Sequence, residues 1–188
     1  MENIRTIKQV KAEILDFAEK NRACYEGKKR VKKATTYNGL LAIIKKHINW
    51  CVKVNLATPE NLERWFEVEA LRKNHIYTSM EVDIFTSDSA EVFVLGNACV
   101  NIVTLGKCQL YLNTYGNCIA RITTKEDSKA TIYSNENSSI KVDAYDTSKV
   151  IARSYDSSSI DFYFSSLTKI DVMKVSELSS LTINGNHK

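Results

Sequence analysis

The feature that most constrains this chain is a ten-residue repeat that runs without insertion through its C-terminal half. From residue 88 the chain divides into nine such units, and the third and fifth residues of every unit are apolar. The third residues are Ala90, Val100, Leu110, Ala120, Ala130, Ile140, Val150, Ile160 and Ile170. Apolar residues two apart lie on one face of a β-strand, and polar turn residues separate the units. The pattern predicts ten to eleven short strands between about 79 and 186.

Two architectures accommodate such strands: a parallel β-solenoid, and an antiparallel meander closed into a barrel or sandwich. Stacked coils place equivalent residues in register and favour one turn chemistry throughout, whereas a meander has no reason to keep it. The uniform turns, such as 145–148 and 155–158, therefore favour the solenoid. A coil of ten residues would be crowded by Phe162 and Phe164, so we expect two or more strands per coil.

The N-terminal part of the chain has helical periodicity. Apolar residues recur every three or four positions over about 3–21 and 36–54, and Thr58-Pro59 is a typical start for a third helix over 58–74. Trp65 and Phe66 on this third helix need cover, which predicts that it caps the first solenoid coil. The expected fold class is α+β, mainly β, with a basic region of three helices over 1–76 and a β-solenoid over 77–188.

The positive charge lies mostly at the N-terminus. Residues 1–53 carry thirteen Lys and Arg against five Asp and Glu. The densest cluster, with two following lysines, consists of Lys28, Lys29, Arg30, Lys32, Lys33, Lys45 and Lys46. Such a cluster can contact the phosphates of a nucleic acid or an acidic partner. The alternative is a solvated basic loop, and few aromatic residues flank the cluster.

Two further columns follow from stacking the repeats by tens. Tyr115, Tyr145 and Tyr155 share the eighth position, and an acidic column that includes Asp146 and Asp156 shares the ninth. Tyrosine is frequent at protein interfaces because it offers both apolar area and a hydroxyl. We predict a protein-binding surface formed by these five residues. The alternative for the acidic column is a solvated edge of turns, since the glycine-rich calcium-binding nonapeptide is absent.

No catalytic residue, metal site or cofactor is predicted. The sequence contains no glycine-rich phosphate loop, G-x-S-x-G or H-E-x-x-H. The spacing of Cys99, Cys108 and Cys118 differs from that of zinc ligands, which predicts buried or corner thiols. The three histidines lie outside the aligned repeats.

Location and assembly follow from simpler features. Five cysteines without disulfide-like spacing and a charged N-terminus favour the cytoplasm, and no apolar stretch is long enough to cross a membrane. The polar end, Asn184 to Lys188, is too short to cover the last strand edge, which predicts a homo-oligomer.

The repeats also carry a resemblance. Units of Ser-x-[Ile/Val]-x-[Val/Ala] with Tyr-Asp-Ser turns follow a lead-in of Leu62-Glu63-Arg64-Trp65-Phe66 and, further on, Leu71-Arg72-Lys73-Asn74-His75-Ile76-Tyr77. Over residues 62–186 this pattern resembles uncharacterised tandem-repeat proteins of Bacteroidales and their phages or prophages. That family has no assigned activity, so the resemblance implies a phage or mobile-element origin and a bacterial host cell, but no site residue.

The function expected from these features is a non-catalytic interaction or structural protein that presents a rigid solenoid surface to a protein partner. The second hypothesis is an inhibitor of a host nucleic-acid-handling defence complex, with the basic N-terminal region in contact with nucleic acid or an acidic partner. A carbohydrate-active solenoid is the third.

Overall fold

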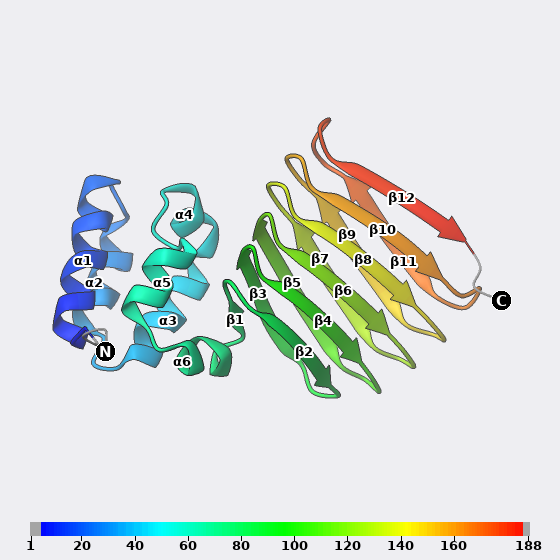
Figure 1. Cartoon of the computed structure of the whole chain (residues 1–188), viewed down its shortest axis with the longest axis horizontal. Coiled ribbons are helices and arrows are strands. Elements are labelled where there is room, and N and C mark those ends of the chain that lie inside the picture. The colour runs from blue at the N-terminus through cyan, green and yellow to red at the C-terminus, as the bar shows by residue number, and fades with distance from the viewer. Residues whose placement is uncertain (1–4, 186–188) are drawn as a thin grey trace. The chain divides into compact units, whose positions relative to one another are not determined.

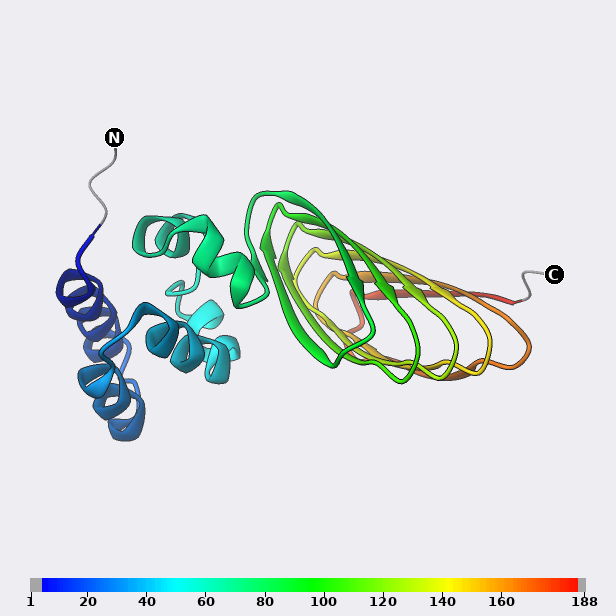
Figure 2. The same cartoon turned by 90° about the horizontal axis from the view of Figure 1, so that it is seen from below.

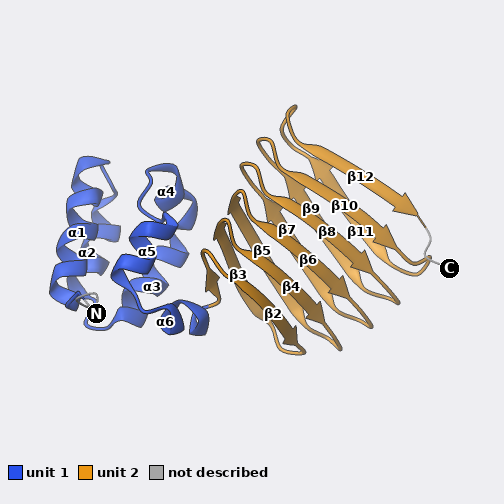
Figure 3. Ribbon diagram, viewed as in Figure 1, with its two compact units in different colours: residues 1–74 blue, residues 75–188 orange. Residues whose placement is uncertain are grey.

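The computed structural model of this protein describes residues 5 to 185, which form two compact units (Figure 3). The first unit, Met1–Asn74, is helical, and the second, His75–Lys188, contains all the described strands. The second unit begins two residues before the predicted boundary because β1 (Ile76–Tyr77) is already part of its sheet.

The second unit is a parallel β-solenoid built from two sheets of six strands each (Figure 1). The first sheet contains β1, β3 (Ala90–Gly96), β5 (Gln109–Gly116), β7 (Lys129–Ser134), β9 (Lys149–Ser154) and β11 (Lys169–Lys174). The second contains β2 (Glu81–Thr86), β4 (Cys99–Thr104), β6 (Ile119–Thr124), β8 (Ser139–Ala144), β10 (Ser159–Phe164) and β12 (Ser180–Gly185). The mainly β fold class and the solenoid are confirmed.

Each coil of the solenoid contains two strands, one from each sheet, as expected from the size of the phenylalanines. Along most of the array a residue pairs with the one twenty positions later, as Ile140 does with Ile160. The separation between paired residues is eighteen at the first complete coil, where Val82 pairs with Val100. It lengthens to twenty-one at the last coil, where Ile160 pairs with Leu181. Figure 2 shows the successive coils stacked around a narrow interior.

The interior is filled by the apolar positions that the repeat predicts. Ile140, Val142, Ile160 and Phe162 are at most 1% exposed, whereas Asp161 faces solvent, as predicted. The corners of each coil are filled by small hydroxyl side chains that bond to one another inside the protein. The hydroxyl of Thr104 donates to that of Ser128 at 3.0 Å, and equivalent pairs recur along both edges. These hydroxyls are hydrogen-bonded, so within residues 5–185 the corners contain no buried side-chain oxygen without a partner.

The described part of the first unit contains six helices rather than the predicted three. They are α1 (Ile7–Lys20), α2 (Tyr25–Lys33), α3 (Tyr37–Lys46), α4 (Ile48–Lys53), α5 (Pro59–Trp65) and α6 (Val68–Lys73). The second predicted helix breaks at His47, and the third breaks at Phe66, whose φ of −130° and ψ of 144° are extended. The predicted start at Thr58 is confirmed, since its hydroxyl accepts a backbone N–H. The hydroxyl of Thr36 caps α3 in the same way.

The segment around Gly27 lies inside α2. This helix begins after Cys24, whose sulfur accepts the Gly27 N–H at 3.3 Å. Val31 is the buried apolar residue of α2. The ammonium of Lys11, on α1, donates to two backbone carbonyl oxygens at the C-terminal end of α2. Tertiary contacts therefore stabilise this basic segment as a helix. Its weak apolar periodicity did not predict a helix.

The two aromatic residues at the end of α5 are covered within the helical unit. The ring of Trp65 packs edge-on against Phe17 of α1, and that of Phe66 packs against Tyr37 of α3. The indole N–H of Trp65 donates to the carboxylate of Glu13 at 2.8 Å. These contacts account for the burial of both rings, so a cover from the solenoid is not required. The capping role of this helix stays a prediction.

Candidate binding surfaces

Because each coil has two strands, the turns of the solenoid alternate between two edges. The turns at 105–108, 125–128, 145–148 and 165–168 lie on one edge, and those at 135–138, 155–158 and 175–179 lie on the other. Tyr145 is therefore on the opposite edge from Tyr115 and Tyr155. The prediction of one continuous tyrosine strip is wrong, because neighbours in space are twenty residues apart and not ten.

Tyr115 also differs from the other two tyrosines in burial. It is 5% exposed, and burial together with the nearby negative charge of Glu136 raises its pKa to about 12. Tyr145 and Tyr155 are both partly exposed, and the ammonium of Lys125 lies 6.0 Å from the ring centroid of Tyr145. Tyr115 therefore packs in the solenoid, and a protein contact through Tyr145 or Tyr155 stays a prediction.

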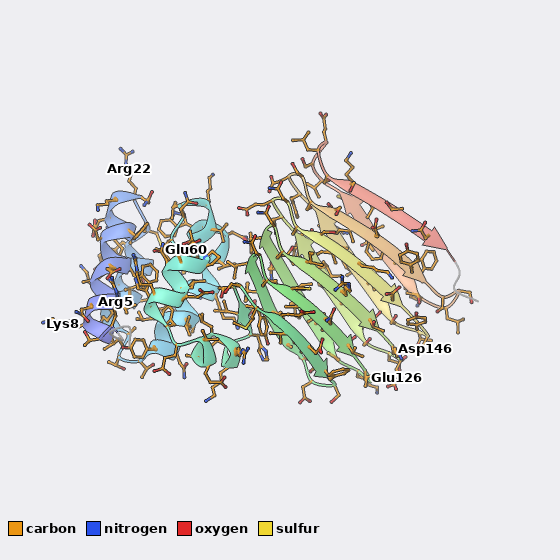
Figure 4. All side chains as sticks on the ribbon, in the orientation of Figure 1. Arg5, Lys8, Arg22, Glu60, Glu126 and Asp146 are labelled. Atoms are coloured by element: carbon orange, nitrogen blue, oxygen red, sulfur yellow. The ribbon has the colours of Figure 1, made fainter. Side chains whose placement is uncertain are left out.

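The acidic column divides between the two edges in the same way and has a structural role. Its members occupy the second residue of each turn with a left-handed backbone, as in Asp146 (φ 57°) and Asp156 (φ 52°). The carboxylate of Asp146 accepts the Glu126 N–H at 2.9 Å, and that of Asp156 accepts the Glu136 N–H at 3.1 Å. Figure 4 shows Glu126 and Asp146 on neighbouring turns of one edge. Each carboxylate binds a turn N–H of the preceding coil, so the acids stabilise the stacked turns.

The basic cluster lies on α2 and at the end of α3. Lys28 forms an ion pair with Glu19 at 3.0 Å, and Lys45 and Lys46 occupy the last turn of α3. Arg30, Lys32 and Lys33 are exposed on the last turn of α2. Cations are favoured there because the C-terminal end of a helix carries partial negative charge. The interpretation of the cluster as a loop is wrong.

The five cations of α2 are not equally available to a partner. Lys28 is tied to Glu19, and Lys29 has Glu26 at 3.9 Å. Within residues 5–185, the side chains of Arg30, Lys32 and Lys33 have no carboxylate at ion-pair distance. These three cations are the ones that a polyanion could bind without displacing an internal partner.

The helical unit also contains an apolar pocket of about 230 Å³, partly open to the surface, between α1, α2, α3 and α4. Cys24, His47 and Cys51 lie on its wall among apolar side chains such as Ile14 and Leu40. Burial raises the pKa of the Cys51 thiol to about 12, so this thiol stays protonated at neutral pH and is a weak nucleophile. Within residues 5–185, no hydrogen bond joins His47 to either thiol.

Cys108 and Cys118 are buried corner residues, as predicted, whereas Cys99 is half-buried and begins β4. Cys108 and Cys118 are at most 1% exposed, and they lie on different edges of the solenoid. The thiol of Cys108 donates to the Asp88 carbonyl at 3.0 Å. In the part of the chain that the structure describes, no three His, Cys, Asp or Glu side chains come close enough to hold a metal ion.

One surface was not predicted, because it becomes visible only at twenty-residue spacing. Lys129, Lys149 and Lys169 begin the neighbouring strands β7, β9 and β11, and each pairs in register with the next. We call these three residues the lysine ladder. A groove beside it is also lined by Lys107, Gln109, Asp127, Thr147 and Leu167. The signal in the sequence is a lysine at the second position of three alternate units, the fifth, seventh and ninth.

The fold defines a repeat protein of the parallel β-solenoid class preceded by a helical unit. No protein-family model, curated protein or solved structure matches this chain. None of the described helices is both long enough and apolar enough to cross a membrane. The resemblance to tandem-repeat proteins of Bacteroidales and their phages stays a prediction.

Proposed function

We propose that this chain is a non-catalytic interaction or structural protein that presents its β-solenoid to a macromolecular partner. The observation that carries the proposal is the in-register stacking of the coils, in which outward side chains of equivalent positions form straight columns. Buried apolar columns and corner hydrogen bonds fix these positions from inside. A surface whose side chains are held in place loses little conformational entropy on binding.

The chemistry of the reactive side chains supports a binding role. The corner hydroxyls, such as those of Ser134 and Ser138, bond to each other at 2.8 Å inside the solenoid. The thiols of Cys51 and Cys118 have pKa values raised by burial to about 12 and about 11. A nucleophile needs an adjacent base or a lowered pKa, so these groups are better suited to structure than to catalysis.

The proposal includes assembly of the chain with a second copy of itself through the C-terminal coil. β11 and β12 are the terminal strands of their sheets. Leu167, Leu178 and Ile183 in this region are 66%, 76% and 51% exposed. Open strand edges beside apolar side chains favour association of strands from two chains.

Light scattering over a range of protein concentrations tests this assembly. The wild type is expected to form a dimer or larger oligomer. Ile183→Lys should shift it toward the monomer, because a charge at the edge opposes strand pairing. Phe85→Lys is the matched control, since Phe85 is 75% exposed on β2 at the other end of the array. A wild type that stays monomeric at high concentration contradicts the assembly.

The main proposal is tested with the full chain and a purified partner. Affinity capture from a bacterial lysate, with and without nuclease, supplies candidate partners, in line with the proposed phage or mobile-element origin and bacterial host. Hydrogen exchange of the purified complex then locates the contact. Protection on outward positions of residues 75–185 is expected. Protection confined to the helical unit, or no partner that binds in purified form, contradicts the proposal.

A second candidate function rests on α2. Exposed Arg30, Lys32 and Lys33 have no ion-pair partner within the described residues, and this supports contact with a nucleic acid or an acidic protein of a host defence complex. This second function predicts that changing all three to Gln abolishes retention on an immobilised nucleic acid and leaves the melting temperature nearly unchanged, because exposed charges contribute little to stability. Retention that does not respond to salt contradicts this function.

A further inference from the structure

The lysine ladder places like charges side by side without compensation. Neighbouring strands are about 4.8 Å apart, so Lys129, Lys149 and Lys169 span only about 10 Å at their backbones. Like charges directly opposite each other on neighbouring strands destabilise a sheet. Within residues 5–185, none of the three ammonium groups has a carboxylate at ion-pair distance.

The groove beside the ladder keeps this excess charge. Lys107 adds a fourth cation to its lining, and Asp127 is the one acidic residue among the lining side chains. The Asp127 carboxylate accepts the Thr147 hydroxyl at 2.6 Å, and it forms no ion pair with any lysine that the structure describes. Four cations and one anion leave a local net charge of +3.

Two other cations on the outer faces of the solenoid are paired with carboxylates. On the same face as the ladder, Arg153 binds the carboxylate of Asp171 at 3.2 Å. On the opposite sheet, Lys141 lies 3.5 Å from a carboxylate oxygen of Asp143. The three ladder lysines have no such partner within residues 5–185, so their charge is available to an anionic ligand.

Aromatic side chains accompany the ladder on the same face of the sheet. Tyr111 of β5 and Tyr133 of β7 point outward and are 47% and 37% exposed. Tyr111 lies two residues after Gln109, which pairs in register with Lys129, and Tyr133 lies four residues after Lys129 on the same strand. A cationic row beside exposed aromatic rings is the combination with which proteins bind single-stranded nucleic acids, because phosphates meet the cations and bases stack on the rings.

We propose that the lysine ladder and its groove bind a single-stranded nucleic acid, with phosphates against Lys129, Lys149 and Lys169 and bases against Tyr111 and Tyr133. The inference rests on the proposed function, since it names a ligand class for the solenoid surface. The bound strand crosses β5 to β11 along the direction in which the coils stack. A duplex hides its bases and would leave the tyrosines unused, and a polyphosphate has no bases to stack.

The test measures the fluorescence anisotropy of labelled oligo-dT and oligo-U of about 16 nucleotides with the full chain. The ladder variant carries Lys129→Gln, Lys149→Gln and Lys169→Gln. It should bind at least about tenfold more weakly at about 50 mM salt, since three phosphate contacts are lost. The slope of log affinity against log salt should fall by about 2, because each phosphate contact to a single strand contributes about 0.7.

Matched variants separate the ladder from its alternatives. Lys8→Gln, Arg22→Gln and Lys53→Gln remove the same charge from exposed positions of the helical unit and should leave the affinity near that of the wild type. The α2 variant, with Arg30→Gln, Lys32→Gln and Lys33→Gln, tests the second candidate function with the same oligonucleotides. Tyr111→Ala with Tyr133→Ala should weaken binding, and the two Phe substitutions should restore it, because stacking needs the ring and not the hydroxyl. Unchanged thermal melting establishes that each variant is folded.

Three results would overturn the inference. The first is that the wild type does not bind the oligonucleotides at low salt. The second is that the α2 variant loses binding and the ladder variant does not. The third is that the tyrosine variants bind like the wild type and that inorganic polyphosphate competes fully with the oligonucleotides. None of these results contradicts the proposed interaction function. That function is contradicted only if no purified partner binds, or if hydrogen exchange shows no protection of the solenoid in the complex.

Discussion

Replacing Phe162 with Ala tests the packing inside the solenoid. The Phe162 ring is fully buried, and its backbone pairs in register with Val142 of β8 and Ile183 of β12. Emptying a core phenylalanine site costs about 3 to 5 kcal/mol of unfolding free energy. Ile183 is 51% exposed, so the last coil can relax into the space, and we expect a cost near 3 kcal/mol. For a chain of this size that cost lowers the melting temperature by about 6 to 12 °C.

Two measurements and one control make this prediction sharp. Thermal and urea unfolding give the loss of stability. Hydrogen exchange should locate it in β10 to β12, because each coil of a repeat protein contacts only its neighbours. Phe85→Ala on the outer face of β2 is the control and should change stability by no more than about 0.5 kcal/mol. If Phe162→Ala melted and exchanged like the wild type, the ring would not be part of a packed interior.

Three other substitutions probe the turns and the helical core. Gly116→Ala should cost at least about 2 kcal/mol of unfolding free energy, and more than Gly106→Ala. A Cβ added at Gly116 would lie 2.8 Å from the Gly96 carbonyl oxygen, whereas the nearest atom to a Cβ added at Gly106 is 3.8 Å away. Equal melting temperatures of the two variants would contradict this close approach. Asp146→Ala should lower the free energy of unfolding, measured with urea, by about 1 kcal/mol. Asp146→Asn should lower it less, because an amide oxygen can still accept the turn N–H. Equal losses in the two variants would show that the charge of the carboxylate matters. Burial raises the pKa of the Cys51 thiol from 9.0 to about 12. The thiol therefore loses its proton at a lower pH in the unfolded chain than in the folded one, so stability should fall as pH rises above 9.0. The melting temperature of Cys51→Ala should depend less on pH across this range, and an unchanged dependence would exclude the thiol as its source.

The fold could be predicted from the sequence because the repeat satisfies simple rules. Period-two apolar spacing sets which side chains enter the interior, and equal unit lengths stack them in register, so the burial of Ile140 and Phe162 followed from the pattern alone. The helical unit was harder. Its apolar spacing located three helical segments, but His47 and Phe66 interrupt two of them, and the basic segment at 25–33 is helical because Val31 and Lys11 connect it to its neighbours.

The amino-acid sequence by itself determined that the strands repeat every ten residues and which face of each strand is buried. Only the tertiary structure decided which repeats are neighbours, because two strands form each coil and residues twenty apart lie side by side. That one fact separates Tyr145 from Tyr115 and brings Lys129, Lys149 and Lys169 into a single row. Side-chain contact depends on strand pairing, and a ten-residue period fits several pairings until the chain closes its coils.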